Sequence, residues 1–146
     1  LHFAADLSRC GIFGHSMGGH GALTLALRHP DLYRSVSAFA PICAPSLCPW
    51  GEKAFGGYLG EERSLWRGHD ATALVEDGHR CPPILIDQGL DDSFLAVQLH
   101  PERFEQVCAD GQPLTLRRHA GYDHGYYFIS TFMADHLAHH AQHLSA

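Results

Sequence analysis

The sequence has 146 residues, of which 45% are hydrophobic and 18% are charged, a composition typical of a globular protein with one compact core. The formal net charge is -6, and the Lys and Arg residues are scattered along the chain. This pattern excludes the basic patch with which proteins bind nucleic acids or anionic membrane surfaces. We therefore expect neither a nucleic-acid partner nor a membrane partner.

The cysteines and the first residues add to this picture. The five cysteines are Cys10, Cys43, Cys48, Cys81 and Cys108. Their spacing fits neither a zinc site nor a dense disulfide scaffold, so we expect reduced thiols in a cytoplasmic protein. No segment resembles a signal peptide or a membrane span. A motif of functional type occurs within the first two dozen residues, which predicts that 1–146 is a single domain lacking its N-terminal half.

In chain order, strand-like and helix-like segments alternate. An apolar run at 10–13 leads into a glycine-rich turn at 14–19 and a helix over 22–28, and a second strand follows at 35–40. Residues 41–82 are rich in Gly, Pro and aromatic residues, which predicts an irregular excursion that borders a site.

The third predicted strand, at 83–87, is rich in β-branched residues. Helical spacing then marks 94–107, with a break at Pro101, before a half-exposed strand at 114–119 and a final helix over 126–144. Buried strands that alternate with helices predict an α/β fold with a mostly parallel sheet and helices on both faces.

The segment Gly14-His15-Ser16-Met17-Gly18 fits the G-x-S-x-G nucleophile elbow, a tight strand-to-helix turn that exposes a serine hydroxyl. Its position between a predicted strand and a predicted helix supports this interpretation. Side chains at Gly14 and Gly18 are expected to collide with the adjoining strand and helix. The Met17 amide, at the helix start, is expected to donate to an oxyanion.

The acid and the histidine of such a hydrolase follow later strands, in the chain order Ser, acid, His. Asp91 and Asp92 follow the strand at 83–87, and one of them could cap the next helix instead. We favour Asp92 as the acid, because related hydrolases place it three residues after a glycine, here Gly89. His124, directly after the strand at 114–119, is the predicted general base.

The other histidines are interpreted as packing or solvated groups. His15 and His20 are joined rigidly to the nucleophile turn and its helix, which is unfavourable for a base. The remaining candidates for a metal site are His136, His139, His140 and His143. They are expected on the polar back of the last helix without acidic or Cys ligands nearby, so no metal site is predicted.

Longer stretches resemble one family. Residues 13–23 (FGHSMGGHGAL), 35–43 (SVSAFAPIC), 48–55 (CPWGEKAF) and 86–89 (IDQG), followed by Tyr122-Asp123-His124, are similar in the same order to S-formylglutathione hydrolases, the esterase D family. The resemblance implies the α/β-hydrolase fold and a Ser16, Asp92 and His124 triad. It also implies hydrolysis of a glutathione thioester to glutathione and formate in formaldehyde detoxification, without a cofactor, often in a homodimer.

Leu90 and Gly125 depart from the family pattern, which commonly has a basic residue and Ser there, and the chain is about half a family member's length. Two other interpretations stay open. The same triad would support a carboxylesterase acting on small acyl esters, because the fold does not choose the acyl group. The chain could also be an inactive half-domain with an exposed sheet edge. Trp50 is either a pocket residue or a loop anchor.

Overall fold

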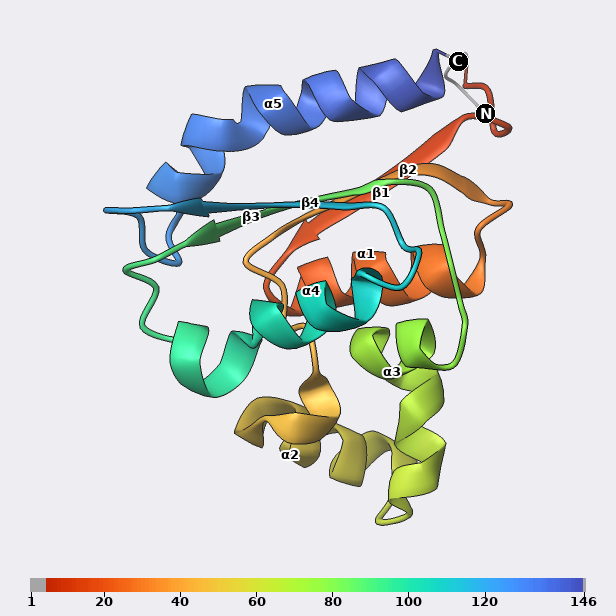
Figure 1. Ribbon diagram of the computed structural model, residues 1–146, viewed down its shortest axis with the longest axis vertical. Coiled ribbons are helices and arrows are strands. Elements are labelled where there is room, and N and C mark those ends of the chain that lie inside the picture. Colours follow the sequence, from red (N-terminus) through yellow and green to blue (C-terminus); the bar gives the residue numbers. More distant parts are fainter. Residues whose placement is uncertain (1–4, 146) are drawn as a thin grey trace.

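The computed structural model describes residues 5–145, which form one parallel sheet between two layers of helices (Figure 1). The strands are β1 (Cys10–His15), β2 (Tyr33–Phe39), β3 (Ile84–Gly89) and β4 (Leu114–His119). They pair in the order of the sequence, β1-β2-β3-β4, and every pairing is parallel. All four predicted strands and the parallel α/β arrangement are therefore confirmed.

Within the described residues, five α-helices and three 3-10 or π-helical turns lie between these strands or after the last of them. The α-helices are α1 (Met17–Arg28), α2 (Pro49–Leu59), α3 (Ala71–Glu76), α4 (Pro101–Cys108) and α5 (Tyr126–Leu144). The turns are η1 (Pro45–Leu47), η2 (Arg63–His69) and η3 (Leu95–Leu99). Helix α5 covers one face of the sheet, and α1, α3 and α4 lie on the other with α2 beyond them (Figure 1). The predicted break between two helical pieces falls at His100, one residue before Pro101.

The core lies on both faces of the sheet, because the central strands are buried on both sides. Val36 and Ile84 pack with Leu23, Leu27 and Phe104 on the side of α1 and α4. A second cluster, formed by Phe39, Ala40, Ile42, Cys48, Leu99 and Phe128, joins the carboxyl end of β2 to η3 and α5. The second cluster thus fixes the loops that follow the strands.

The prediction of an irregular excursion over 41–82 is wrong. These residues form η1, α2, η2 and α3. Pro49 occupies the first turn of α2, where its missing N–H costs no hydrogen bond. Asp70 caps α3 by accepting from the Ala73 N–H and also accepts from the Ser46 N–H, at 3.1 and 2.9 Å. Short helices fixed by such caps carry too few turns for an apolar periodicity to be recognised.

The prediction for the histidines of α5 is also wrong. His136 and His140, expected on the polar back of this helix, are buried against the sheet, whereas Leu137 is 57% exposed. His140 bonds to both Ser35 and Ser37, and His136 Nδ1 lies 2.8 Å from Ser37 Oγ. The side of β2 that faces α5 carries polar side chains. The face of α5 that bears these histidines is therefore the buried one.

Asp87 extends this buried polar network into β3. Its carboxylate is fully buried and accepts two hydrogen bonds from Arg117, both 2.6 Å, with His136 Nε2 at 2.9 Å and His119 Nε2 at 3.0 Å. Burial alone would raise the pKa of Asp87, but the bonds to His136, Arg117 and His119 outweigh it and hold the pKa well below its usual value. The expectation that no acidic group lies near the histidines of the last helix is therefore wrong, because Asp87 bonds to His136.

Candidate active site

The three residues predicted to act together follow β1, β3 and β4 at their carboxyl ends. Because the strands are parallel, these ends meet at one edge of the sheet, where ligands of open α/β sheets bind. Ser16 comes directly after β1, Asp92 three residues after β3, and His124 five residues after β4. The alternation of strands and helices thus gathers residues that lie more than 100 positions apart.

Ser16 occupies a strained turn between β1 and α1. Its backbone has φ 58° and ψ -115°, an unusual conformation for a residue with a side chain. The Ser16 N–H donates to Phe39 O at 2.9 Å, and the Ser16 carbonyl accepts from the N–H groups of His20 and Ile42. These bonds to β2 and to the residues after it hold the turn in place.

One of the two glycine expectations at this turn is correct. A Cβ at Gly14 would overlap the backbone carbonyl of Gly18, so the strand and the helix can approach this closely only with glycine at 14. A Cβ at Gly18 would meet nothing within 4 Å among the described residues. The expected collision at Gly18 is therefore wrong, because this residue lies on the exposed side of α1.

The acid and the histidine are in direct contact. Asp92 Oδ2 lies 2.6 Å from His124 Nδ1, and Asp92 Oδ1 accepts from the Phe94 N–H at 2.9 Å. Asp91 is exposed and contributes only its N–H, which donates to Tyr122 O at 3.0 Å. Asp92 thus combines the two functions that were considered as alternatives, since it bonds to the histidine and also caps the start of the helical segment.

Burial and hydrogen bonding act on Asp92 in opposite directions. Burial alone would raise the pKa of its carboxyl group. The hydrogen bonds from His124 and from the Phe94 N–H outweigh this effect, and the pKa is lowered below its usual value. Asp92 is therefore an ionised partner that can hold the His124 ring in one tautomer.

The loops that carry Asp92 and His124 are joined through their backbones. A Cβ at Gly89 would overlap the carbonyl group of Tyr122, so the end of β3 and the His124 loop pack backbone to backbone. The Leu90 N–H donates to His119 O at 2.9 Å and the Asp91 N–H to Tyr122 O. This close approach sets the distance between the acid and the histidine.

The His124 ring lies between β1 and η3. Its centroid is 4.4 Å from that of His15 and 5.1 Å from that of Phe94. Since His15 directly precedes Ser16, the contact brings His124 to the nucleophile turn. Within residues 5–145, the His124 ring bonds to Asp92, and no hydrogen bond joins it to the Ser16 hydroxyl.

The two histidines near Ser16 are packing groups, as expected. Burial and the neighbouring His124 lower the pKa of His15. His20 Nε2 accepts the Ala71 N–H at 3.2 Å, and burial lowers the pKa of His20 to about 4. Both rings are therefore neutral at pH 7.

A pocket of about 210 Å³ opens beside Ser16. Its lining is mostly apolar and consists of Ser16, Met17, His20, Ile42, Pro45, Trp50, Gly51, Ala54 and Phe55. Trp50 is both a pocket residue and an anchor, because its ring packs on Phe94 at 4.7 Å and its backbone N–H donates to Gln98 Oε1 at 3.0 Å. The segment 41–82 therefore borders the site, as the sequence predicted, with α2 forming one wall.

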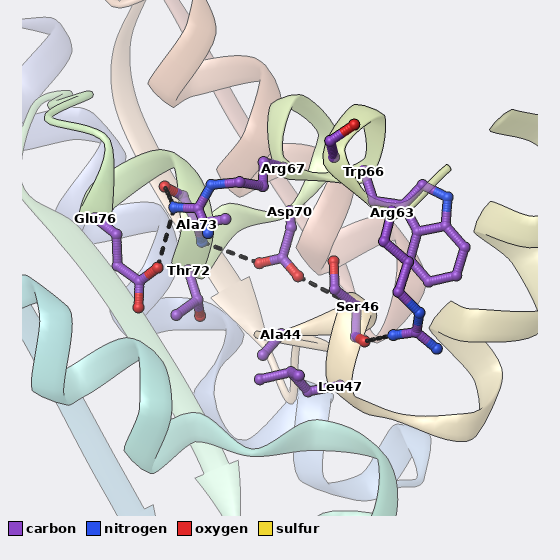
Figure 2. A pocket seen from close by; sticks show the side chains of 11 residues that line it. Ala44, Ser46, Leu47, Arg63, Trp66, Arg67, Asp70, Thr72, Ala73 and Glu76 are labelled. Atoms are coloured by element: carbon purple, nitrogen blue, oxygen red, sulfur yellow. Dashed lines mark hydrogen bonds and ion pairs between the residues drawn. The ribbon is translucent and has the colours of Figure 1, made fainter. Parts of the chain in front are cut away.

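A larger cavity, of about 340 Å³, shares no lining residue with this pocket. Figure 2 shows that Asp70 points between the backbone N–H groups of Ser46 and Ala73 and that Arg67 reaches Glu76. The Arg67 guanidinium also bonds to Asp77 at 2.6 Å. The fourth charged residue of the lining, Arg63, pairs with Glu52 at 3.1 Å, so each of these charged side chains is bound to another group of the protein.

Three further features concern metals, membranes and thiols. Within residues 5–145, no group of three or more His, Cys, Asp and Glu side chains has a metal-binding arrangement. The same residues include no helix with the length and apolar character needed to span a membrane. All five cysteine thiols are free, and burial raises the pKa of Cys81 and Cys108 to about 12.

Sequence reasoning missed two contacts of the site. Gln88 donates from Nε2 to Asp92 Oδ2 at 3.1 Å, and the ring of His15 packs on that of His124. For Gln88 a signal was available, because two polar residues end the otherwise apolar strand Ile84-Leu85-Ile86-Asp87-Gln88. Polar groups in a buried strand need partners, and those partners mark a site or a network.

Comparison with known proteins agrees with this geometry. A family model described as "Putative esterase" matches residues 2–139. The S-formylglutathione hydrolase of Rattus norvegicus is 56% identical over 99% of this chain and 52% of its own length, and that of Arabidopsis thaliana is 54% identical over 94% and 49%. The chain thus spans about half the length of the curated relatives it matches.

A solved structure shows the same arrangement of elements. The S-formylglutathione hydrolase from Agrobacterium tumefaciens superposes with a TM-score of 0.95 at 59% sequence identity, over 98% of this chain and 52% of that one. The parallel sheet, the helices on both faces and the strained serine turn are those of an α/β-hydrolase. From the match over residues 2–139 and this superposition, we conclude that the chain belongs to the esterase family.

Proposed function

We propose that this chain carries the catalytic residues of a thioesterase that hydrolyses S-formylglutathione to glutathione and formate. The observation that carries the proposal is the 54–56% identity, over nearly the whole chain, to enzymes of that name. The contact between His124 and Asp92 and the strained turn at Ser16 support it. In this proposal Ser16 is the nucleophile, His124 the base and Asp92 the acid.

The first half of the reaction forms an acyl-enzyme. Ser16 Oγ attacks the formyl carbon while the free nitrogen of His124, Nε2, takes the hydroxyl proton. Asp92 Oδ2 accepts the bond from Nδ1 and stabilises the imidazolium. The C–S bond then breaks, and the glutathione sulfur leaves with the bonding electrons and takes the proton from His124.

The second half of the reaction releases formate. A water molecule gives a proton to His124 Nε2 and attacks the formyl-Ser16 ester, and Ser16 Oγ leaves with that proton. In this proposal the N–H of Met17, the first residue of α1, donates to the oxyanion in both halves, as the first N–H groups of a helix have no partner within the helix. We further propose that the other oxyanion donor comes from a segment that corresponds to the first half of the relatives.

A carboxylesterase acting on small acyl esters is the second candidate. The pocket beside Ser16 favours it, because a cavity of about 210 Å³ with mostly apolar walls is larger than a formyl group requires. The same triad cleaves both esters and thioesters, so the acyl group and the leaving group have to be tested separately.

The test is hydrolysis of S-formylglutathione and of a simple acetyl ester by two proteins. One is the present chain; the other, the extended chain, is the same chain preceded by the residues of the rat enzyme that come before its matched segment. Ser16→Ala is the control in both. We expect rapid thioester turnover by the extended chain and its loss in Ser16→Ala.

The other outcomes separate the alternatives. Turnover of the ester alone would replace the thioesterase proposal with the carboxylesterase. Turnover of neither substrate, together with no labelling of Ser16 by a fluorophosphonate, would overturn the triad and leave an inactive half-domain. In that case the open edge of β1, where Phe13 is 48% exposed, would be a surface for pairing with another chain.

The cellular setting is part of the same proposal. Buried free thiols fit a reducing compartment, so we place the enzyme in the cytoplasm, in formaldehyde catabolism. No cofactor takes part in these steps, and a homodimer is the proposed assembly. Sedimentation of the extended chain would test the dimer.

A further inference from the structure

Gln88 is a fully buried amide at the end of β3, four residues before Asp92. Its Nε2 donates to Asp92 Oδ2 at 3.1 Å and to Gly89 O at 2.9 Å. Both partners are acceptors only, so the amide must present its nitrogen to them. The orientation of Gln88 is thus fixed by the group that bonds to His124.

The other end of the same amide has no partner. Gln88 Oε1 is buried and accepts no hydrogen bond among the described residues. A buried orphan acceptor is costly in a folded protein. An apolar residue would avoid that cost, so the contribution of Gln88 must lie in its donor side, toward Asp92.

The two donors on Asp92 Oδ2 compete for one oxygen. His124 Nδ1 lies 2.6 Å from Oδ2, and Gln88 approaches the same atom, while Oδ1 is occupied by the Phe94 N–H. A second donor on Oδ2 draws electron density from it and makes the carboxylate a weaker base. It also prevents the carboxylate from rotating away from the ring.

We propose that Gln88 is a positioning residue for the acid, which fixes the Asp92 carboxylate toward His124 and limits how strongly it stabilises the imidazolium. This inference rests on the proposed function, in which His124 acts as a base and must be neutral to do so. By keeping Asp92 a weaker acceptor, Gln88 lessens the stabilisation that the carboxylate gives to the protonated ring.

Few charged groups lie near Asp92 and His124. The His15 ring faces His124 from the end of β1, and Asp92 faces it from the loop after β3. Arg118 on β4 is in register with Gln88, but its guanidinium pairs with Glu105 at 2.6 Å. Asp87 precedes Gln88, and its carboxylate is taken up by Arg117, His119 and His136.

The test is Gln88→Met, which keeps the side-chain length and removes both donors. In the extended chain, the acid limb of the profile of kcat/KM against pH should move to higher pH by about half a unit, because the stronger acceptor favours the imidazolium. The loss of kcat/KM should be larger at pH 6 than at pH 8. The midpoint of the His124 ring resonance in an NMR titration should move by the same amount, with His124→Gln used to assign the resonance.

Two comparisons separate positioning from mere packing. Gln112→Met removes another buried amide, one that bonds to Cys81 N and to the carbonyls of Pro82 and Pro113, and it should leave both midpoints unchanged. In an Asp92→Asn background, Gln88→Met should have no further effect on the acid limb, because the effect passes through the carboxylate. If Gln88→Met does not fold, Gln88→Asn takes its place. Its side chain is shorter by one methylene, which moves the amide donor away from Asp92, and it should shift both pH midpoints in the same direction.

Unchanged midpoints in a folded Gln88 variant would overturn the inference. An effect of equal size in the Asp92→Asn background would overturn it as well. The NMR titration requires no turnover, so a chain that fails to hydrolyse S-formylglutathione still tests Gln88. Failure of the proposed function and failure of this inference are therefore distinguishable.

Discussion

Asp87 on β3 and His136 on α5 are joined by a buried hydrogen bond of 2.9 Å, although 49 residues separate them in the sequence. Ser37 on β2 bonds to the other nitrogen of the same ring. The helix is thus attached to two strands through one histidine. Because these groups are hidden from water, their polar bonds must stay intact for the helix to remain on the sheet.

Asp87→Asn should destabilise the protein by about 3 kcal/mol, because it removes a fully buried carboxylate charge that pairs with the partly exposed Arg117 and bonds to His119 and His136. Urea unfolding followed by circular dichroism measures the loss. Asp135→Asn is the matched control, since Asp135 pairs with the same Arg117 at 2.9 Å but is 54% exposed. It should cost about 0.5 kcal/mol or less. Equal losses in the two variants would contradict the importance assigned to burial.

Acidification should destabilise the fold below pH 6.5. Burial, with the neighbouring histidines, lowers the pKa of His140 to about 4, and burial lowers that of His20 to about 4. The unfolded chain, with ordinary histidines, binds these protons near pH 6.5, so stability is full above that pH and is lost as the pH falls toward 4. Each group contributes up to about 1.4 kcal/mol per pH unit in this window.

The pH effect is measured by urea unfolding at pH 7, 6 and 5. His140→Asn should flatten the dependence by the equivalent of about one proton, whatever its effect on stability at pH 7. The exposed His29 provides the control, and His29→Asn should leave the slope unchanged. A slope unaffected by His140→Asn would show that this ring is not held neutral in the folded state.

Gly89→Ala should separate the acid from the histidine. The new Cβ would overlap the Tyr122 carbonyl group, so the loop that carries His124 must move. We expect kcat/KM of the extended chain to fall by about a hundredfold, as a displacement of about 1 Å at a catalytic group can produce.

Gly56→Ala in α2 is the control for this substitution. A Cβ there meets nothing within 4 Å among the described residues, and alanine favours a helix by up to about 1 kcal/mol over glycine. This variant should be as active as the parent and slightly more stable. Full activity of Gly89→Ala would indicate that the two loops can separate without affecting the site.

Asp92→Asn should lower kcat by about ten thousandfold, because an amide would no longer favour the working tautomer of His124. Asp91→Asn should change kcat by no more than about twofold, since only its backbone contacts the His124 loop. Steady-state hydrolysis by the extended chain measures both variants. A large effect of Asp91→Asn with a small effect of Asp92→Asn would reverse the assignment.

The strands, the order of the elements and the contact between Asp92 and His124 were predictable from local patterns. The motif at Ser16 and the residues that follow β3 and β4 are encoded by short stretches of sequence. In a parallel sheet the carboxyl ends of the strands lie at one edge, so the residues that follow them come together without any further signal in the sequence. Local rules suffice where each element is long enough to show its period.

The remaining features depend on contacts between distant residues. The helices within 41–82 are held by Asp70 and by packing over the site, and the buried side of α5 is decided by Ser35, Ser37 and Asp87. A histidine is polar by composition, but with two bonded nitrogens it packs as a core residue. The polar end of β3 was a signal for Gln88, but its partner Asp92 is defined only once β3 and the loop after it have folded.

The order of the strands has a consequence for the making of the protein. Since β1, β2, β3 and β4 are neighbours in the order in which they are synthesised, each strand can dock on the one before it as the chain leaves the ribosome. The nucleophile turn is then complete early, while the histidine arrives with β4 and is secured only when α5 covers the sheet. Ser16 and His124 can therefore come together only after β2, β3 and β4 have been added to β1.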